Sequence, residues 1–322
     1  MQLNSGGAGT GVAIGCPAHV GLTLPRTSVE RLGFVALAFA LSLAAALAQA
    51  ATVSAVDDAG HVIGLPAPAA RIVSLAPHAT ELLFAAGAGS HVVGVSQFSN
   101  YPPEANRIAL VGGAATLDLE RIIGLKPDLV VGWGSGSSAA QLARLRSLGI
   151  AVFESEPTDF EAVASSLERL ATLAGTDAVG RAAALRFRDE LEQLRRTYAA
   201  RSPVTMFFQV WPAPLMTLND AHLVSAAMHV CGAKNIFGGL PQLAPTVSVE
   251  AVLQADPDVI ASSGSEHSDA LKSWRRFSAL KAVARGNLVL LPGDTMTRAG
   301  PRIVEATRSL CRQLDAARQR LK

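Results

Sequence analysis

The sequence predicts an α/β protein: two similar α/β lobes with parallel-type sheets, joined by one long, rigid interlobe α-helix, with a ligand cleft between the lobes. Three observations predict this fold. Short β-branched runs alternate with helix-sized segments in both halves of the chain, one amphipathic segment separates the halves, and a sequence pattern recurs 130 residues further along. A length of 322 residues agrees with about two domains.

The first half alternates strands with short helices. Gly87 and Gly149 end two of the predicted helices, and Pro127 stops a third because proline disfavours a helical residue before it. The predicted strands are residues 71–75, 92–95, 129–131 and 150–153, and the predicted helices are residues 80–87, 120–125 and 141–148.

The segment from Asp177 to Arg201 has a different pattern. Its apolar residues recur at spacings of three and four, and charged residues fill the opposite face. These apolar residues are Ala184, Phe187, Leu191, Leu194 and Tyr198. The pattern predicts one amphipathic helix of about 23 residues, roughly 35 Å long, which would act as a strut between the lobes.

After Ser202-Pro203 the alternation of strands and helices resumes. The relevant runs are residues 204–209, 224–231, 249–253, 259–262, 288–291 and 304–314. The sequence therefore predicts an N-terminal region of residues 1–50, an N-terminal lobe of residues 51–176, a linking helix of residues 177–201 and a C-terminal lobe of residues 202–322. Residues 51–70 are expected to be a polar lead-in.

The recurring pattern is a short helix, a Pro-Asp turn and a buried strand. Residues 119–131 (LERIIGLKPDLVV) match residues 249–261 (VEAVLQADPDVIA), so that Glu120 corresponds to Glu250. Six or more similar positions in register predict a duplicated architecture. Two similar lobes leave a cleft between them, where ligands usually bind.

The charge balance excludes some partners. The chain has 28 Lys and Arg against 26 Asp and Glu, a net charge of +2. A broad nucleic-acid surface or a polybasic membrane patch needs clustered positive charge, so we expect no nucleic-acid partner.

The N-terminus has the three parts of a secretory signal peptide. Arg26 and Arg31 precede the apolar run Phe34–Ala48, and Ala48-Gln49-Ala50 is a small-x-small cleavage site. The alternative is an uncleaved anchor, but the run is shorter than the ~20 residues that span a bilayer. The residues before Arg26 are long for such a leader, which indicates that the true start lies after Met1. We therefore expect an exported protein.

Motifs for chemistry are mostly missing. The sequence contains no phosphate loop, no nucleophile elbow and no HExxH motif. Residues 132–137 (GWGSGS) lack the spacing of a dinucleotide loop, so we expect a loop at the cleft rim. The seven histidines show no metal-ligand spacing. We therefore expect no catalytic residue, no resident metal and no cofactor. His78 either faces the cleft or is a solvated loop histidine.

Aromatic residues are few, so their positions carry information. Phe98 and Tyr101 lie in a loop after a strand, and Trp133 and Trp211 each follow a strand. Loops after the strands of α/β lobes face the ligand crevice. Each of these aromatic side chains either contacts a ligand or packs its loop against its own lobe.

Cys231 and Cys311 both fall in the second lobe. Export to an oxidising compartment favours a disulfide between them. The alternative is two separate buried thiols.

The chain resembles the periplasmic solute-binding proteins of the helical-backbone type (class III), which serve ABC importers of cobalamin, ferric siderophores and haem. The resemblance covers about residues 70–316. It rests on residues 71–87 (RIVSLAPHATELLFAAG), on 93–96 (VGVS) with 101–103 (YPP), and on 119–123 (LERII) with 126–130 (KPDLV). It also rests on 230–237 (VCGAKNIF), 247–250 (VSVE) and 298–302 (RAGPR).

The resemblance implies roles for individual residues. Phe98 and Trp133 match aromatic residues that contact cobalamin, and residues 294–298 match a ligand loop of the second lobe. That loop contributes Asp294, Thr295, Met296, Thr297 and Arg298. The family pattern has Trp and Phe at positions 295 and 296, and cobalamin-binding members have tryptophans at positions 114 and 244, where this chain has alanine.

The same resemblance implies a disulfide between Cys231 and Cys311. It also implies that Glu120 and Glu250 each dock onto arginines of a membrane permease. The alternative for the two glutamates is that they are merely first-turn acids of two short helices.

Together these features predict a monomeric periplasmic binding protein, not an enzyme, that captures a corrinoid and delivers it to the permease dimer of an ABC importer. A haem or ferric-siderophore carrier is the alternative in the same family. An exported hydrolase that uses His78 and a cleft serine is the alternative of another class.

Overall fold

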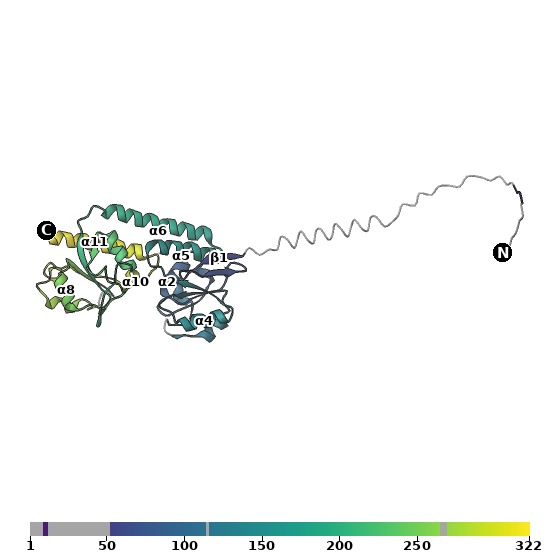
Figure 1. Cartoon of the computed structure of the whole chain (residues 1–322), viewed down its shortest axis with the longest axis horizontal. Helices are drawn as coiled ribbons and strands as arrows, with labels where there is room; N and C mark the ends of the chain where they lie inside the picture. Colours follow the sequence, from purple (N-terminus) through teal and green to yellow (C-terminus); the bar gives the residue numbers. More distant parts are fainter. Residues whose placement is uncertain (1–8, 12–51, 114–115, 265–268) are drawn as a thin grey trace, which may run out of the picture. The chain divides into compact units, whose positions relative to one another are not determined.

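The computed structural model describes residues 9–11, 52–113, 116–264 and 269–322. All of the described helices and strands belong to the unit Ala51–Lys322 (Figure 1). The predicted signal segment, residues 34–48, lies outside the described residues. Within the described part of the chain, no helix has the length and apolar character that crossing a membrane requires.

The first lobe contains a five-stranded parallel sheet with the strand order β5-β4-β3-β8-β9. Its strands are β3 (Ile72–Ser74), β4 (Val92–Val95), β5 (Ala109–Leu110), β8 (Leu129–Trp133) and β9 (Ala151–Ser155). Its helices are α2 (Pro77–Ala85), α3 (Leu119–Gly124), α4 (Ala139–Ser147) and α5 (Phe160–Ala174).

The second lobe contains a four-stranded parallel sheet with the order β13-β10-β14-β15. Its strands are β10 (Val204–Gln209), β13 (Ala233–Asn235), β14 (Val259–Gly264) and β15 (Leu288–Pro292). Its helices are α7 (Leu223–Val230), α8 (Val249–Ala255), α9 (Lys281–Ala284), α10 (Gly293–Met296) and α11 (Ile303–Leu321).

The predicted linking helix is α6 (Asp177–Tyr198), which packs along α5 and also contacts α11 (Figure 1). Its buried residues include Phe187, Leu191 and Leu194, three of those that the periodicity selected. These side chains join a hydrophobic core that is continuous from Ile72 in the first sheet to Phe208 in the second. The two lobes are therefore connected by shared packing as well as by the chain.

Each sheet also has a second, separate core on its other face. Val73, Val130 and Val152 pack against Leu142 and other side chains of the α3 and α4 face. In the second lobe Phe207, Ile260, Val252 and Trp274 do the same. Successive strand residues point to opposite faces, so each apolar strand supplies both cores, as expected for parallel strands covered on both sides.

The repeated pattern forms the same structure in both lobes. Asp118 and Ser248 accept hydrogen bonds from the backbone N–H groups of the first turns of α3 and α8. The Asp of each Pro-Asp turn, Asp128 and Asp258, accepts backbone N–H groups at the start of the neighbouring strand, at 2.8–2.9 Å. The fold thus confirms the duplicated architecture.

Two expectations about elements were wrong, and one helix was not predicted. Residues 51–70 contain an antiparallel hairpin, β1 (Val53–Val56) with β2 (Val62–Leu65), because residues alternate there between exposed and at least partly buried positions. Helix α5 was not predicted, although Asp159 caps it and Gly175 ends it with a φ of 71°. Helix α2 begins three residues earlier than residue 80, since Pro77 supplies a φ that suits the first turn.

Short elements complete the fold. They are β6 (Gly112–Gly113), β7 (Thr116–Leu117), β11 (Trp211–Pro212), β12 (Leu215–Met216) and the 3₁₀ helices η1 (Gly89–His91), η2 (Pro103–Arg107) and η3 (Lys272–Arg276). Trp211 lies in the antiparallel hairpin of β11 and β12, where it pairs with Met216.

Cys231, which follows α7, and Cys311 of α11 form a disulfide. Both residues are fully buried. The disulfide confirms the predicted pair and closes a loop across 80 positions of the second lobe.

Candidate functional site

Loops at the carboxyl ends of the strands in both lobes surround a cavity of about 170 Å³. In the first lobe these loops follow β3, β8 and β9, and in the second they follow β12, β13 and β15. The described residues that line the cavity are Pro77, His78, Trp133, Glu156, Pro157, Thr158, Ala221, His222, Leu223, Leu243, Met296, Thr297, Arg298 and Ala299. The cavity therefore lies between the two lobes.

His78 is a buried, uncharged residue that lines this cavity. Its ring meets the Trp133 ring edge to face at a centroid distance of 5.8 Å, and Nε2 lies 3.2 Å from the Ser155 hydroxyl. Burial lowers the pKa of His78 to about 4, despite the nearby carboxylate of Glu156. The solvated-loop alternative is thus wrong, because His78 lies in the first turn of α2 and only 6% of it is exposed.

Glu156 follows strand β9, and His222 caps helix α7 on the other lobe. The Glu156 carboxylate accepts the backbone N–H of Ser135 through Oε2 at 2.7 Å. The backbone N–H of Val224 donates to Nδ1 of His222 at 3.0 Å. Burial lowers the pKa of His222, and the Glu156 carboxylate opposes that shift. Glu156 and His222 thus line the same cavity from opposite lobes.

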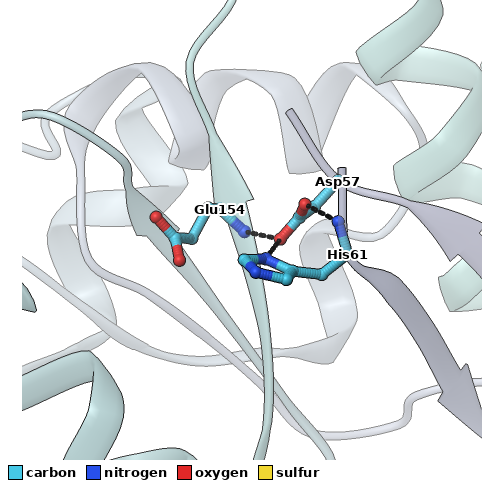
Figure 2. A group of neighbouring side chains, drawn as sticks. All are labelled: Asp57, His61 and Glu154. Carbon is cyan, nitrogen blue, oxygen red and sulfur yellow. Dashed lines mark hydrogen bonds and ion pairs between the residues drawn. The ribbon is translucent and has the colours of Figure 1, made fainter. Parts of the chain in front are cut away.

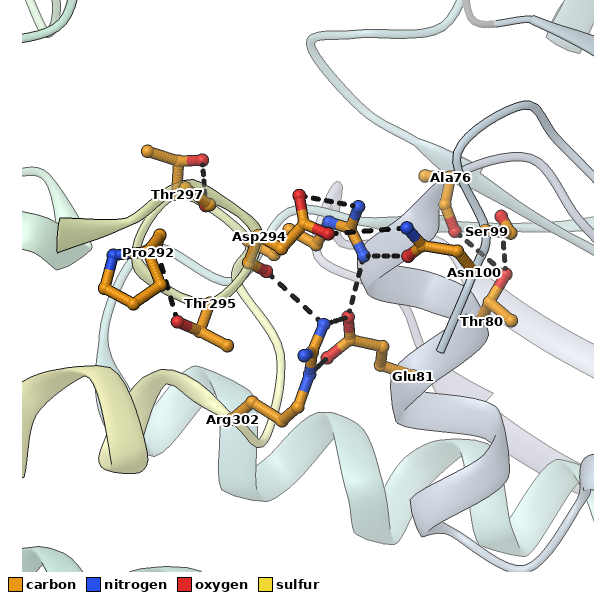
Figure 3. Close-up of polar contacts among 12 residues, drawn as sticks. Ala76, Thr80, Glu81, Ser99, Asn100, Pro292, Asp294, Thr295, Thr297 and Arg302 are labelled. Carbon is orange, nitrogen blue, oxygen red and sulfur yellow. Dashed lines mark hydrogen bonds and ion pairs between the residues drawn. The ribbon is translucent and has the colours of Figure 1, made fainter. Parts of the chain in front are cut away.

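Glu81 of α2 joins the lobes through two arginines of the second lobe. Its side chain is 2% exposed, and it accepts from Arg302 through both oxygens at 2.5 and 2.9 Å and from Arg298 at 3.1 Å (Figure 3). The Glu81 carboxylate raises the pKa of Arg302. Arg298 also donates to Asn100 at 2.8 Å and pairs with Asp294 at 3.3 Å. All three nitrogen–carboxylate contacts of Glu81 thus cross from one lobe to the other.

Four of the nine predicted ligand residues line the cavity: Trp133, Met296, Thr297 and Arg298. Met296 is 1% exposed, so it supports the wall and offers little contact surface. Thr295 and Asp294 are not among the lining residues, and the Thr295 hydroxyl donates to the Pro292 carbonyl (Figure 3).

Phe98 and Trp211 are exposed aromatic side chains outside the cavity lining. Phe98 is 76% exposed and Trp211 57%. Phe98 has a φ of 65°, a left-handed conformation that is costly for a bulky residue and that often occurs at functional sites. The Trp211 indole N–H donates to the Ala213 carbonyl at 3.0 Å, which fixes the ring on its own hairpin.

Tyr101 lies in a different place. The Arg302 guanidinium sits 3.9 Å from its ring centroid, and both residues line a second, open groove of about 840 Å³ between α2 and α11. Tyr101 therefore lies behind the interlobe contact of Glu81, and the structure does not bring it into the cavity.

Sequence reasoning did not select Glu156, His222 or Leu243. Glu156 and His222 are 66 positions apart and lie on different lobes, so no local spacing connects them. The usable signal was that Glu156 follows a predicted strand at residues 150–153, where loops face the crevice.

Glu120 and Glu250 are both exposed first-turn residues, in α3 and α8. A helix that precedes a parallel strand runs back from the carboxyl edge of its sheet, so both first turns lie at the edge where the cavity opens. The two carboxylates therefore hold equivalent positions in the two lobes.

A cluster of Asp57, His61 and Glu154 lies within the first lobe (Figure 2). Its ligand atoms fall within 4.8 Å of one another, a spacing that also suits a metal ion. The Asp57 carboxylate, however, accepts the backbone N–H groups of Ala59, His61 and Glu154, and the Glu154 side chain pairs with Arg146. These contacts support a structural role, in which Asp57 joins the hairpin of β1 and β2 to strand β9.

Comparison with known proteins decides the family. A family model described as periplasmic binding protein matches residues 72–295. The chain belongs to the periplasmic binding protein family. Among its members, a vitamin B12-binding protein of Vibrio cholerae is 38% identical over 260 residues, which are 80% of this chain and 94% of the relative. A vitamin B12-binding protein of Photorhabdus laumondii is 36% identical over 76% of this chain and 88% of the relative.

Solved structures agree with the two-lobed fold. The periplasmic vitamin B12 binding protein BtuF of Vibrio cholerae superposes with a TM-score of 0.71 and 37% identity over 78% of this chain and 98% of that one. A periplasmic heme-binding protein, RhuT of Roseiflexus sp. RS-1, superposes with a TM-score of 0.68 over 77% and 98%, at 24% identity. At that identity the second likeness is evidence of the fold alone.

Proposed function

We propose that this member of the family is a periplasmic carrier that captures a corrinoid between its lobes and delivers it to the permease dimer of an ABC importer. The observation that carries the proposal is the 38% identity to a vitamin B12-binding protein over 94% of that relative's length. Corrinoids are the cobalt macrocycles to which vitamin B12 belongs.

The shape of the site supports a large, flat ligand. The cavity volume of about 170 Å³ is below the 300–1,000 Å³ usual for small-molecule pockets. A macrocycle would therefore lie across the mouth and send only some of its side groups inward. Trp133 lines the cavity and is partly exposed. We expect the exposed rings of Phe98 and Trp211 to add broad apolar surface around the bound macrocycle. Asp294, Thr295 and Thr297 would contact the ligand from the second lobe, while Tyr101 would do so only if the interlobe contact rearranged.

The proposal includes the partner and the compartment. Glu120 and Glu250 would meet arginines of the permease, one glutamate for each half of a twofold partner. Residues 1–50 would contain the leader, with lobes at residues 51–176 and 202–322 on either side of the linking helix. Before docking, the carrier would be a monomer without a resident cofactor, since the corrinoid is its cargo.

Isothermal titration of the mature protein tests the proposal. The panel is cyanocobalamin, cyanocobinamide, haemin and a ferric siderophore. We expect saturable binding of at least one of the two corrinoids and weaker binding of the other ligands. Binding of haemin or the siderophore with no heat from either corrinoid would contradict the proposal and favour the alternative carriers.

One contact favours a second candidate, an exported hydrolase. His78 and the Ser155 hydroxyl form a His–Ser pair at 3.2 Å. Ser155 is fully buried, so a substrate carbonyl has no easy access to its hydroxyl. His78 has a low pKa, so it is a weak base for removing the proton of that hydroxyl. Turnover of an ester substrate that disappears in His78→Ala would support the hydrolase; no turnover with intact ligand binding would support the carrier.

A further inference from the structure

We propose that Glu156 and His222 form a recognition pair for a primary carboxamide, which makes the cavity select macrocycles with amide side chains over those with carboxylates. The inference rests on the proposed function, because it names the ligand groups that enter the cavity. Corrinoids carry acetamide and propionamide groups, whereas haem carries propionates.

Glu156 presents an acceptor. Its backbone N–H is held by Asp58 at 2.6 Å, and Oε2 accepts the Ser135 N–H at 2.7 Å. These two bonds fix the position of the carboxylate on the wall, while Oε1 has no hydrogen bond within the described part of the chain. Oε1 is therefore available to accept an N–H from a ligand amide.

His222 presents a donor. The Val224 N–H can only donate, so Nδ1 of His222 must carry the lone pair. An imidazole whose Nδ1 carries a lone pair is neutral, and its one ring proton is on Nε2. Burial, which lowers the pKa of His222, favours this neutral form. The cap thus fixes the tautomer, and Nε2–H is left to donate to a ligand carbonyl.

The charged side chains that line the cavity also favour an amide over a carboxylate. Arg298 and Glu156 are the only formally charged side chains among its described lining residues, and His78 and His222 are neutral. Arg298 is already engaged by Glu81, Asp294 and Asn100. The unpaired charge that faces a ligand is therefore the carboxylate of Glu156.

An amide fits this pair and a carboxylate does not. The NH₂ of a primary amide donates to Oε1 of Glu156, and its C=O accepts from Nε2–H of His222, so both groups are satisfied by one ligand side chain. A ligand carboxylate has no hydrogen to donate and is repelled by Glu156 at short range.

The test compares amide and acid forms of one macrocycle. The probes are cyanocobalamin and its three propionic monocarboxylates, in each of which one amide is hydrolysed, titrated at pH 7 into wild type and Glu156→Gln. We expect wild type to bind at least one monocarboxylate about 10-fold or more weakly than cyanocobalamin. In Glu156→Gln that ratio should fall to about threefold or less, because the isosteric amide removes the repulsion.

Two further variants isolate the cause. Glu154→Gln removes the same charge from strand β9 outside the cavity, and we expect it to keep the wild-type ratio. His222→Asn keeps an oxygen to cap α7 but lacks the reach of Nε2. It should weaken cyanocobalamin binding about 3- to 10-fold without changing the unfolding midpoint.

Equal binding of amide and acid forms by wild type, or an unchanged ratio in Glu156→Gln, would overturn the inference while corrinoid binding itself stood. If wild type bound haemin and no corrinoid, the proposed function would fail, and the pair would be tested with haemin against its bis-amide. A preference for the bis-amide that Glu156→Gln removes would sustain the inference, and a preference for haemin would overturn it.

Discussion

The two lobes are alike in the helices α3 and α8 and different in the loops that line the cavity between them. Helices α3 and α8 share a polar cap, a first-turn glutamate, a residue with φ of 43–48° before proline and an aspartate that anchors the neighbouring strand. The cavity walls share no such pattern: His78, Trp133 and Glu156 face His222, Leu243 and Arg298.

This difference separates two tasks. Equivalent positions on two lobes suit a partner with twofold symmetry, because the same contact is made twice. Unlike walls suit a ligand whose two faces differ. Under the proposed function, the similar outer edges would serve the permease and the different inner loops would serve the ligand. Each of the following variants changes one of these two regions.

The second lobe contains the disulfide, so the largest effect should come from its removal. Cys231→Ala with Cys311→Ala should lower the free energy of unfolding by about 4 kcal/mol, because the loop spans 80 positions. Urea unfolding measures this loss. Reductant should lower the stability of wild type similarly and leave the double variant unchanged. Equal stability of wild type with and without reductant would contradict the prediction.

The inner wall of the first lobe should make stability depend on pH through His78. The unfolded chain binds a proton at His78 below about pH 6.5, and the folded chain does so only near pH 4. The unfolded state therefore holds more protons between these values, and stability falls as pH falls through that window, by about 3 kcal/mol at most.

His78→Gln should reduce this loss between pH 7 and pH 4.5, as measured by urea unfolding at both values. His222→Asn should act in the same direction, since burial also lowers the pKa of His222. Leu185→Ala, which changes an exposed residue without a titratable group, is the control and should keep the wild-type dependence on pH. An unchanged pH dependence in His78→Gln would show that His78 titrates normally.

The shared outer edge should matter to the permease and not to folding. Glu120→Ala with Glu250→Ala should weaken the complex with the permease about 100-fold, because two linked contacts are lost together. The unfolding free energy should change by only ~0.3–1 kcal/mol for each site, the value of a first-turn acid. Pull-down and uptake assays measure the first effect and urea unfolding the second.

Asp189→Ala, an exposed acid on α6, is the matched control and should not affect the complex. Each single variant should show a smaller effect than the pair. If the double variant binds its permease normally, the two glutamates are helix-terminal acids and no more.

Most of the fold could be predicted because its signals are local. The strand of residues 204–209 and the helix that begins at Asp177 were predicted from apolar runs and from periodicity. The hairpin of β1 and β2 was missed because its stability comes from distant partners, such as the bond from the Glu154 N–H to Asp57. Helix α5 has its cap, its period and its closing glycine, and these signals were overlooked.

The site was less predictable, for a physical reason. Trp133 and Arg298 were selected by resemblance and line the cavity. Glu156 and His222 line it from different lobes, so their presence in one cavity depends on how the two lobes meet. Tyr101 was selected for its loop, and its ring packs under Arg302 instead, because the guanidinium of an interlobe ion pair offers it a cation–π contact.

The affinity of Phe98→Ala with Trp133→Ala for cyanocobalamin tests the central claim most directly. The account holds that a corrinoid binds between the two lobes, against aromatic side chains. The double variant should then bind about 10-fold or more weakly than wild type in isothermal titration, because large buried aromatic contacts dominate such interfaces. Leu185→Ala, which removes an exposed apolar side chain from α6, should bind as wild type does. Equal affinity of the double variant and wild type would contradict the account, since the ligand would then bind somewhere other than between the lobes.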